Sequence, residues 1–248
     1  MYSHQKPPTT AAAGIAAPSL PVALERDGYA LIEGALSADQ CISLCKALSD
    51  IVLTSGSGGE RNILRRPEII DLCHEASLAS TVIDLLGEDA FAYKATLLDK
   101  TPQANWKVTW HQDLSIPVRG NTRPESWKAW SVKAQVLHAQ PPVELLARTL
   151  AVRVHLDECG EHAGALRVIP GSHTSGRLAP AAIEQWKATR IAASCGIGAG
   201  GLMLMKPLLL HASSASENPT RRRVVHLEFA AEELPEGLDW AERIPVLA

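Results

Sequence analysis

The sequence lacks an excess of charge of either sign. Its 24 basic and 27 acidic side chains give a formal net charge of -3 with histidine counted as neutral. Proteins that hold nucleic acid through its phosphates usually carry a strongly basic surface. The composition therefore argues against nucleic acid as a partner, and we expect a small molecule instead.

Long apolar runs and a cysteine framework are also missing. No stretch approaches the roughly 20 apolar residues that a membrane-spanning helix requires, and the N-terminus lacks the basic and apolar regions of a secretion signal. The 5 cysteines are an odd number without Cys-x-x-Cys spacing, which fits reduced thiols better than disulfides. We therefore expect a cytoplasmic protein without membrane association.

What the sequence does contain is enough apolar material for one sizeable core. It has 248 residues with 46% apolar content, and β-rich enzymes of this length are often single domains. Residues 1–21 show neither helical nor alternating periodicity, so we predict a disordered tail there. The single domain should then occupy residues 22–248.

Helical patterns come first in this domain and strand patterns follow. Apolar spacing, capping residues and prolines at helix starts predict helices over residues 38–49, 67–74, 77–86 and 180–189. Runs rich in β-forming residues predict strands over residues 90–100, 106–110, 150–156, 165–169 and 202–205. Helices on the outside of a β-structure are the expected arrangement.

The stretch Trp110-His111-Gln112-Asp113 contains a candidate metal site. On an extended strand, His111 and Asp113 project from the same face and can bind one cation. A second histidine would complete the set, and His211 is the best candidate, with His138 as the alternative. Two histidines and one carboxylate with open positions are the ligands of a non-haem Fe(II) oxygenase.

Further stretches extend this pattern into a family resemblance. In chain order the sequence resembles the phytanoyl-CoA dioxygenase family of Fe(II)- and 2-oxoglutarate-dependent oxygenases at His111-x-Asp113, Gly164–His173, His211-Ala212-Ser213 and Arg221-Arg222-Arg223. The resemblance runs from about Leu24 to Phe229. It implies a mostly β fold with flanking helices, built as a double-stranded β-helix (jelly-roll, cupin-like) barrel. His173 belongs to a structural corner of that family, so we do not expect it to bind metal.

The resemblance also implies roles for single residues. His111, Asp113 and His211 would be the catalytic iron ligands. Two further residues, Arg222 and Ser213, would bind 2-oxoglutarate, and a guanidinium suits this because it holds a carboxylate through two parallel hydrogen bonds.

Some assignments around the cofactor stay open. Arg221 or Arg223 would replace Arg222 if the strand register shifted by one. We assign Gln112, between the first two ligands, to cofactor binding as well. Three lysines are further candidates to bind a carboxylate, and the sequence does not choose among Lys94, Lys100 and Lys107.

The segment 114–148 follows directly after the first ligands and is interrupted by Pro117, Gly120, Pro124, Pro141 and Pro142. This irregularity predicts a lid or substrate loop. Its basic residues outnumber Glu125 and Glu144, and they could either attract an anionic substrate or form a solvated rim. They are Arg119, Arg123, Lys128, Lys133 and Arg148.

The implied reaction converts 2-oxoglutarate and O2 to succinate and CO2 while a small organic substrate is hydroxylated or otherwise oxidised. Halogenating relatives lack the carboxylate ligand, so Asp113 favours hydroxylation. Two alternatives stay open: a cupin-like metal-dependent isomerase or hydrolase, which would not need Arg222, and a non-catalytic binding protein on the same fold. The substrate and the oligomeric state are not indicated.

Overall fold

The computed structural model describes residues 19–51, 53, 59–160, 163–217 and 221–247. Most of the predicted tail, residues 1–21, lies outside these ranges. The end of the predicted disordered tail is instead helical, because helix α1 (Leu20–Arg26) begins there with Pro21 in its first turn. Proline is tolerated at this position since its missing N–H group would have no partner in the helix.

A seven-stranded antiparallel sheet forms the centre of the molecule, in the order β1-β11-β8-β13-β3-β15 with β2 beside β3. Its longest strands, β3 and β13, pair so that Lys100 lies opposite Arg222 and Lys94 opposite Glu228. The strands are β1 (Tyr29–Ile32), β2 (Glu60–Arg61), β3 (Phe91–Lys100), β8 (Leu150–His155), β11 (Leu202–Met205), β13 (Arg222–Ala230) and β15 (Ile244–Pro245).

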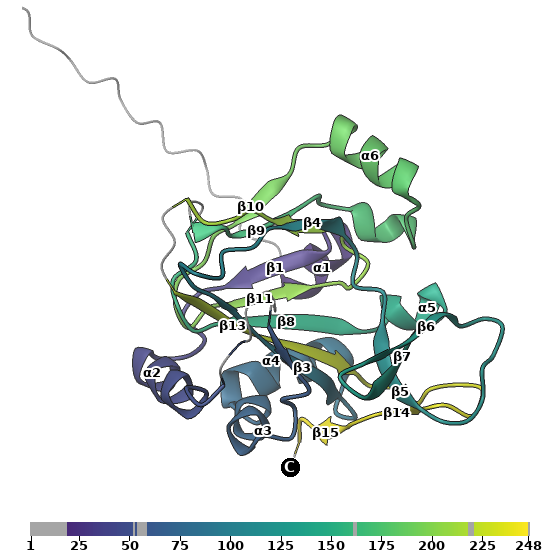
Figure 1. The fold of residues 1–248 in the computed structure, drawn as a ribbon, viewed down its shortest axis with the longest axis horizontal. Helices are drawn as coiled ribbons and strands as arrows, with labels where there is room; N and C mark the ends of the chain where they lie inside the picture. Colours follow the sequence, from purple (N-terminus) through teal and green to yellow (C-terminus); the bar gives the residue numbers. More distant parts are fainter. Residues whose placement is uncertain (1–18, 52, 54–58, 161–162, 218–220, 248) are drawn as a thin grey trace, which may run out of the picture.

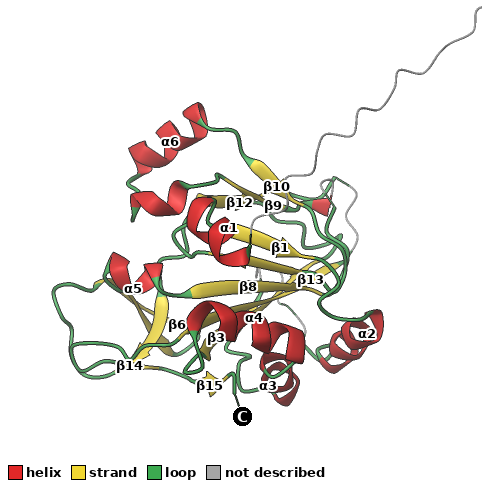
Figure 2. Ribbon diagram, turned by 180° about the vertical axis from the view of Figure 1, so that it is seen from behind, coloured by secondary structure: helices red, strands yellow, loops and turns green. Residues whose placement is uncertain are grey.

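The two faces of this sheet differ because side chains alternate along each strand. One face is apolar, with Val154, Val225 and Leu227 fully buried in the main core. Helices α2 (Ala38–Ala47), α3 (Pro67–Cys73) and α4 (Ala76–Leu86) pack against it, as Figures 1 and 2 show. The other face carries polar and charged side chains.

The predicted helices agree with these elements, with one change at a helix start. A capping box begins α2, where the Ser37 hydroxyl accepts from the Gln40 N–H at 3.2 Å and the Gln40 side chain accepts from the Ser37 N–H at 2.8 Å. Helix α4 begins earlier than predicted because Glu75, and not Ser77, provides the cap. A carboxylate can accept from the free N–H groups of the first turn in the same way as a hydroxyl.

A four-stranded sheet, β10-β9-β12-β4, lies over the polar face of the large sheet (Figure 1). It consists of β4 (Val108–His111), β9 (Leu166–Val168), β10 (Ala193–Cys195) and β12 (His211–Ser213). The expected mostly β, jelly-roll-like fold with flanking helices is confirmed. The strands that the structure describes form separate sheets and do not close into one barrel.

The segment 114–148 is more regular than its prolines and glycine suggest. It forms the strands β5 (Ile116–Arg119), β6 (Lys128–Lys133) and β7 (Val136–Gln140), which join β14 (Asp239–Trp240) in a third sheet, and then helix α5 (Val143–Ala147). The partner strand β14 comes from the C-terminal part of the chain, so local composition could not reveal the pairing. The apolar core of this sheet includes Trp127 and Trp240.

Two smaller elements complete the described part of the chain: the 3-10 turn η2 (Ser172–Ser175) and helix α6 (Pro180–Thr189), which stands apart from the sheets in Figure 1. Within the described ranges, none of the helices combines the length and apolar character needed to cross a membrane.

Candidate functional site

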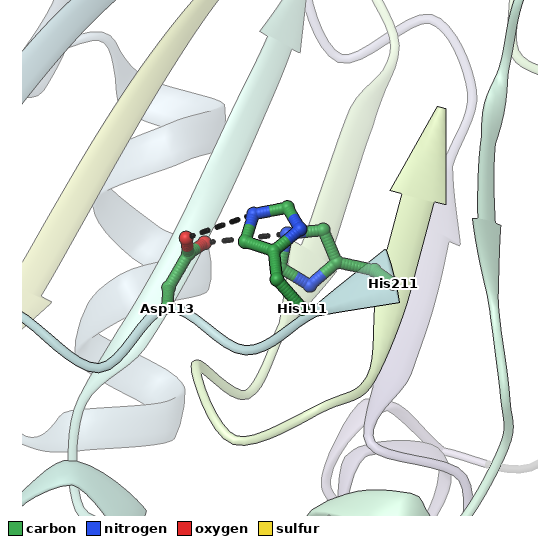
Figure 3. Close-up of side chains that lie close together, drawn as sticks. All are labelled: His111, Asp113 and His211. Atoms are coloured by element: carbon green, nitrogen blue, oxygen red, sulfur yellow. Dashed lines mark ion pairs between the residues drawn. The ribbon is translucent and has the colours of Figure 1, made fainter. Parts of the chain in front are cut away.

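Strand pairing brings two of the predicted ligands together. In the antiparallel pair β4 and β12, His111 lies directly opposite His211, and their ring centroids are 4.2 Å apart. The Asp113 carboxylate reaches both rings: Oδ1 lies 3.6 Å from Nε2 of His111, and Oδ2 lies 3.6 Å from Nε2 of His211 (Figure 3). One ligand atom from each residue lies within 4.8 Å of the other two, so the three can share one ion.

Hydrogen bonds set the tautomers of both histidines. Nδ1 of His111 lies 2.9 Å from the Thr109 carbonyl, and Nδ1 of His211 lies 2.8 Å from the Leu209 carbonyl. A carbonyl oxygen can only accept, so each Nδ1 carries the hydrogen and each Nε2 presents its lone pair to the Asp113 side. Metal-binding histidines are commonly oriented in this way by a backbone carbonyl.

The protonation states of His211 and Asp113 also suit a metal. Burial lowers the pKa of His211 to about 4, so its ring is neutral near neutral pH. Burial acts to raise the pKa of Asp113, but the neighbouring histidines outweigh it and hold this pKa well below the ordinary value. Burial acts to lower the pKa of His111, but hydrogen bonding to Asp113, the charge of Asp113 and backbone hydrogen bonds together raise this pKa above its ordinary value, and a cation would replace the proton. A carboxylate and neutral imidazoles are the forms that bind metal.

The three candidate ligands line a cavity of about 280 Å³ between the seven-stranded sheet and the sheet that contains β4 and β12. Its wall carries the cationic side chains Lys100, Arg153 and Arg222. In the part of the chain that is described, none of these three forms an ion pair; their hydrogen bonds go to hydroxyl, carbonyl, imidazole and thiol groups. A group of buried cations without counter-charges is a site for an anion.

Arg222 is buried in this group, with 5% of its surface exposed. Its Nη1 donates to the Gly164 carbonyl and lies 3.3 Å from Cys159 Sγ, whereas its buried Nε has no hydrogen-bond partner. A guanidinium with an unused N–H group suits a carboxylate. Its neighbours on the strand point elsewhere, as alternation requires: Arg221 pairs with Asp99 at 2.8 Å and Arg223 with Asp157 at 2.7 Å.

The three candidate metal ligands and the three buried cations together determine which cofactors fit the cavity. Two imidazole nitrogens and one carboxylate suit Fe(II) and leave positions open on the metal. A 2-oxo acid can occupy two of these positions, and the second carboxylate of 2-oxoglutarate matches the unpaired charge of Arg222. Fe(II) and 2-oxoglutarate therefore fit this cavity.

Ser213 and Gln112 lie in different environments. Ser213 lines the cavity, where its hydroxyl donates to the Gly164 carbonyl at 2.9 Å and accepts from Lys100 Nζ at 2.9 Å. The Gln112 side chain instead donates to the carbonyls of Gly176 and Leu208, at 2.8 and 2.6 Å, and accepts from a backbone N–H group. These bonds favour a structural role for Gln112 over the predicted cofactor binding, because alternation turns it away from its ligand neighbours.

The structure chooses among the remaining candidates. Lys94 and Lys100 line the cavity, whereas Lys107 is exposed to solvent. The alternative ligand His138 lies in a neighbouring cavity, outside the group of three ligands. The His173 Nε2 lies 3.1 Å from the Glu25 carbonyl, as expected for a residue in a structural corner.

Sequence reasoning missed two buried residues beside the ligands. His226 Nε2 lies 3.9 Å from Asp113 Oδ2 and 3.4 Å from Glu228 Oε1. Glu228 in turn accepts from Lys94 Nζ at 2.5 Å and from the Tyr93 hydroxyl at 2.9 Å. The signal was present in the sequence, because His226 and Glu228 continue the two-residue period of Arg222 along an otherwise apolar strand.

Comparisons with known proteins agree with this fold. Ectoine dioxygenase from Sphingopyxis alaskensis is 28% identical over 167 residues, which are 61% of this chain and 48% of that enzyme. The chain thus spans about half the length of this curated relative.

Solved structures are similar over a larger share of the chain. The structure of EctD from S. alaskensis with bound Fe has a TM-score of 0.68 at 23% identity. The match covers 94% of this chain and 83% of the EctD chain. The non-heme alpha ketoglutarate dependent epimerase SnoN from nogalamycin biosynthesis has a TM-score of 0.63 at 18% identity, with coverages of 85% and 81%. At these identities the likeness establishes the fold.

The family assignment rests on a match over most of the sequence. The family model described as "Phytanoyl-CoA dioxygenase (PhyH)" matches residues 24–224. This range contains the His111, Asp113 and His211 group and Arg222, whereas His226 and Glu228 of the cavity wall follow just after it. The chain belongs to the phytanoyl-CoA dioxygenase family.

Proposed function

We propose that this chain is an Fe(II)- and 2-oxoglutarate-dependent dioxygenase that hydroxylates a small organic substrate. In this reaction a substrate C–H group, 2-oxoglutarate and O2 yield the C–OH product, succinate and CO2. The observation that carries the proposal is the convergence of His111, Asp113 and His211 beside a buried arginine with an unpaired N–H group.

Each group of side chains in the cavity would then have a separate role. The three ligands would hold the iron on one side and leave the cavity side free for O2 and the 2-oxo acid. Ser213 and Arg222 would orient the far carboxylate of the 2-oxo acid, and Lys100 would add charge beside them. The apolar wall residues of the cavity, including Leu98 and Leu166, would limit the entry of water.

A substrate-free experiment tests this proposal. Fe(II) and 2-oxoglutarate are added without oxygen, and the visible charge-transfer band of the metal-bound 2-oxo acid is recorded. We expect the band in the wild type and in His138→Ala, and its loss in His211→Ala. If well-folded wild-type protein gives no band, or if His138→Ala removes it instead, this assignment of ligands is wrong.

Arg222→Gln separates the alternative functions, because only the oxygenase should lose affinity for 2-oxoglutarate in this variant while it keeps its metal. A cupin-like isomerase or hydrolase would bind metal without needing Arg222, so Arg222→Gln would leave its reaction intact. A non-catalytic binding protein would bind neither iron nor 2-oxoglutarate. The unpaired cations of the cavity support the oxygenase, because neither alternative explains three buried positive charges.

We also propose that the partner is a small molecule and that the protein is cytoplasmic. All five cysteines are free thiols in the structure, which supports a reducing compartment. Fractionation of cells with an antibody against the protein would test the location.

A further inference from the structure

A second cavity lies beside the iron ligands, and we propose that it binds an anionic group of the substrate, specifically a carboxylate. The inference rests on the proposed function and specifies its substrate class. This cavity measures about 340 Å³, and the cationic side chains on its wall are Arg61, Lys94 and Lys133.

The second cavity adjoins the first and shares part of its wall. His111 and Asp113 line both, and so do Arg61 and Lys94. The cations assigned to 2-oxoglutarate line only the first cavity, whereas Lys133 lines only the second. A molecule held in the second cavity would therefore adjoin the metal ligands without using the Arg222 site.

Arg61 and Lys133 supply the charge that is free to bind an anion. Lys94 is already neutralised by Glu228, whose Oε1 lies 2.5 Å from its Nζ. Among the residues whose placement is described, no acidic side chain forms an ion pair with Arg61 or Lys133, and Lys133 Nζ donates to the Ser115 hydroxyl at 3.4 Å. Burial lowers the pKa of Lys133, and repulsion from Lys94 and Arg61 lowers it further. An anion between these groups would relieve that repulsion.

The remaining wall of the second cavity contributes no compensating charge beyond Asp113. Burial lowers the pKa of His138, which keeps this ring neutral near neutral pH. Ser115 and Gln140 are uncharged hydrogen-bonding groups. Across both cavities, 6 cationic side chains face 2 carboxylates. A divalent ion and the dianion 2-oxoglutarate cancel each other, so the excess of positive charge remains for the substrate.

The backbone places Lys133 beside Arg61 through an unusual turn. The two residues after Lys133, Ala134 and Gln135, join β6 to β7 with φ angles of 46° and 66°. This left-handed conformation is normally left to glycine or asparagine. The Ala134 carbonyl accepts from Asn62 Nδ2 at 3.1 Å, and Asn62, next to Arg61, has a φ angle of 61°. Strained residues of this kind are concentrated at ligand sites.

The other basic residues of segment 114–148 have different contacts. Arg119 pairs with Asp239 at 3.5 Å, and Arg148 pairs with Glu232 at 2.8 Å. Arg123 lies over the ring of Trp130, 4.5 Å from its centroid. Of the basic residues in this segment, Lys133 is the one that lines the second cavity.

The test uses a panel of small carboxylates, aliphatic, aromatic and N-acylated, each paired with its primary amide. The full-length protein with Fe(II) and 2-oxoglutarate is titrated with each compound without oxygen, and the shift of the charge-transfer band gives the half-saturating concentration. The variants are Arg61→Gln and Lys133→Gln. The control is Lys128→Gln, which removes a lysine from the same strand β6 but outside both cavities.

We expect at least one carboxylate to shift the band at concentrations where its amide does not. Arg61→Gln and Lys133→Gln should each raise the half-saturating concentration of that carboxylate by about tenfold or more, as loss of one charged hydrogen bond does. The half-saturating concentration of 2-oxoglutarate should stay unchanged, and Lys128→Gln should behave as wild type.

Three results would overturn the inference. In the first, no carboxylate of the panel shifts the band at a lower concentration than its amide. In the second, Arg61→Gln and Lys133→Gln bind the carboxylate as well as Lys128→Gln does. In the third, these two variants weaken the binding of 2-oxoglutarate as much as the binding of the carboxylate. Absence of the band in the wild type would instead contradict the proposed function. Calorimetric titration of metal-free protein with the same pairs would then decide on the second cavity, with the same expected preference for carboxylates and the same three variants.

Discussion

His111 and His211 face each other across the paired strands β4 and β12, with their ring centroids 4.2 Å apart. Because Asp113 follows His111 and its N–H donates to the Pro207 carbonyl at 2.9 Å, the strand end and its partner hold all three ligands in one place. The register of this one strand pair therefore determines the candidate metal site. Four predictions follow the charges and hydrogen bonds around it.

Replacing Arg222 should weaken 2-oxoglutarate without releasing iron. Arg222→Gln removes a buried guanidinium that the cosubstrate would use, and such a loss typically costs 2 kcal/mol or more, so the half-saturating concentration of 2-oxoglutarate should rise by at least about 30-fold. The charge-transfer band measures this, and Fe(II) titration should be unchanged. Arg221→Gln is the matched control, because Arg221 pairs with Asp99 outside the cavity. Equal effects of both variants would contradict this role for Arg222.

Binding of 2-oxoglutarate should weaken at high pH through Lys100. Burial, and then the charge of Arg222, lower the pKa of Lys100 to about 8. Below this pH the Lys100 ammonium is present and can attract the 2-oxoglutarate dianion. Above this pH the lysine is neutral and must first take up a proton before it can do so. The half-saturating concentration should be flat below about pH 8 and rise by up to about tenfold per pH unit above it.

Lys100→Met should remove this rise, and Lys107→Met, which deletes an exposed lysine, should keep it. The measurement is the titration of the charge-transfer band at several pH values. A rise of the same steepness in Lys100→Met would show that another group titrates.

Gln112→Ala should destabilise the fold and leave 2-oxoglutarate binding nearly unchanged. The substitution leaves the Gly176 and Leu208 carbonyls without their donor, and each buried polar group that loses its partner costs about 1–3 kcal/mol. Urea unfolding of the metal-free protein measures the loss. A large rise in the half-saturating concentration of 2-oxoglutarate at unchanged stability would instead restore the predicted cofactor role of Gln112.

Glu228→Gln should lower the free energy of unfolding by about 3 kcal/mol near neutral pH, because Lys94 would keep a charge without its partner. Burial acts to raise the pKa of Glu228, but attraction by Lys94 and the interactions with His226 together outweigh it and lower this pKa to about 2 from an ordinary 4.5. Because its pKa is lower in the folded state, ionised Glu228 stabilises the fold at pH values above its ordinary pKa of 4.5. The difference between wild type and variant should therefore shrink as the pH falls from about 4.5 towards 2.

Urea unfolding at a series of pH values tests this expectation. The control is Glu232→Gln, because Glu232 and its partner Arg148 are both more than half exposed, and such surface pairs contribute at most about 1 kcal/mol. A loss in Glu228→Gln no larger than in the control would mean that the buried pair does not stabilise the fold.

Local patterns in the sequence were enough to group His111 with Asp113 and to place helices such as α2. The two-residue period of a strand placed His111 and Asp113 on one side and set Arg222 apart from Arg221 and Arg223, as the structure shows. Helical spacing and a capping box likewise predicted helix α2. These features depend on neighbouring residues, so the sequence by itself determines them.

Only the tertiary structure decided which distant residues join this site. The selection of Lys94 and Lys100 over Lys107, the approach of His226 to Asp113, and the strands within 114–148 all depend on pairing between remote segments. A local period states which residues share a face, but it does not state which face becomes buried or against what. That choice is made by the packing of the whole chain, where burial of apolar surface outweighs local preference.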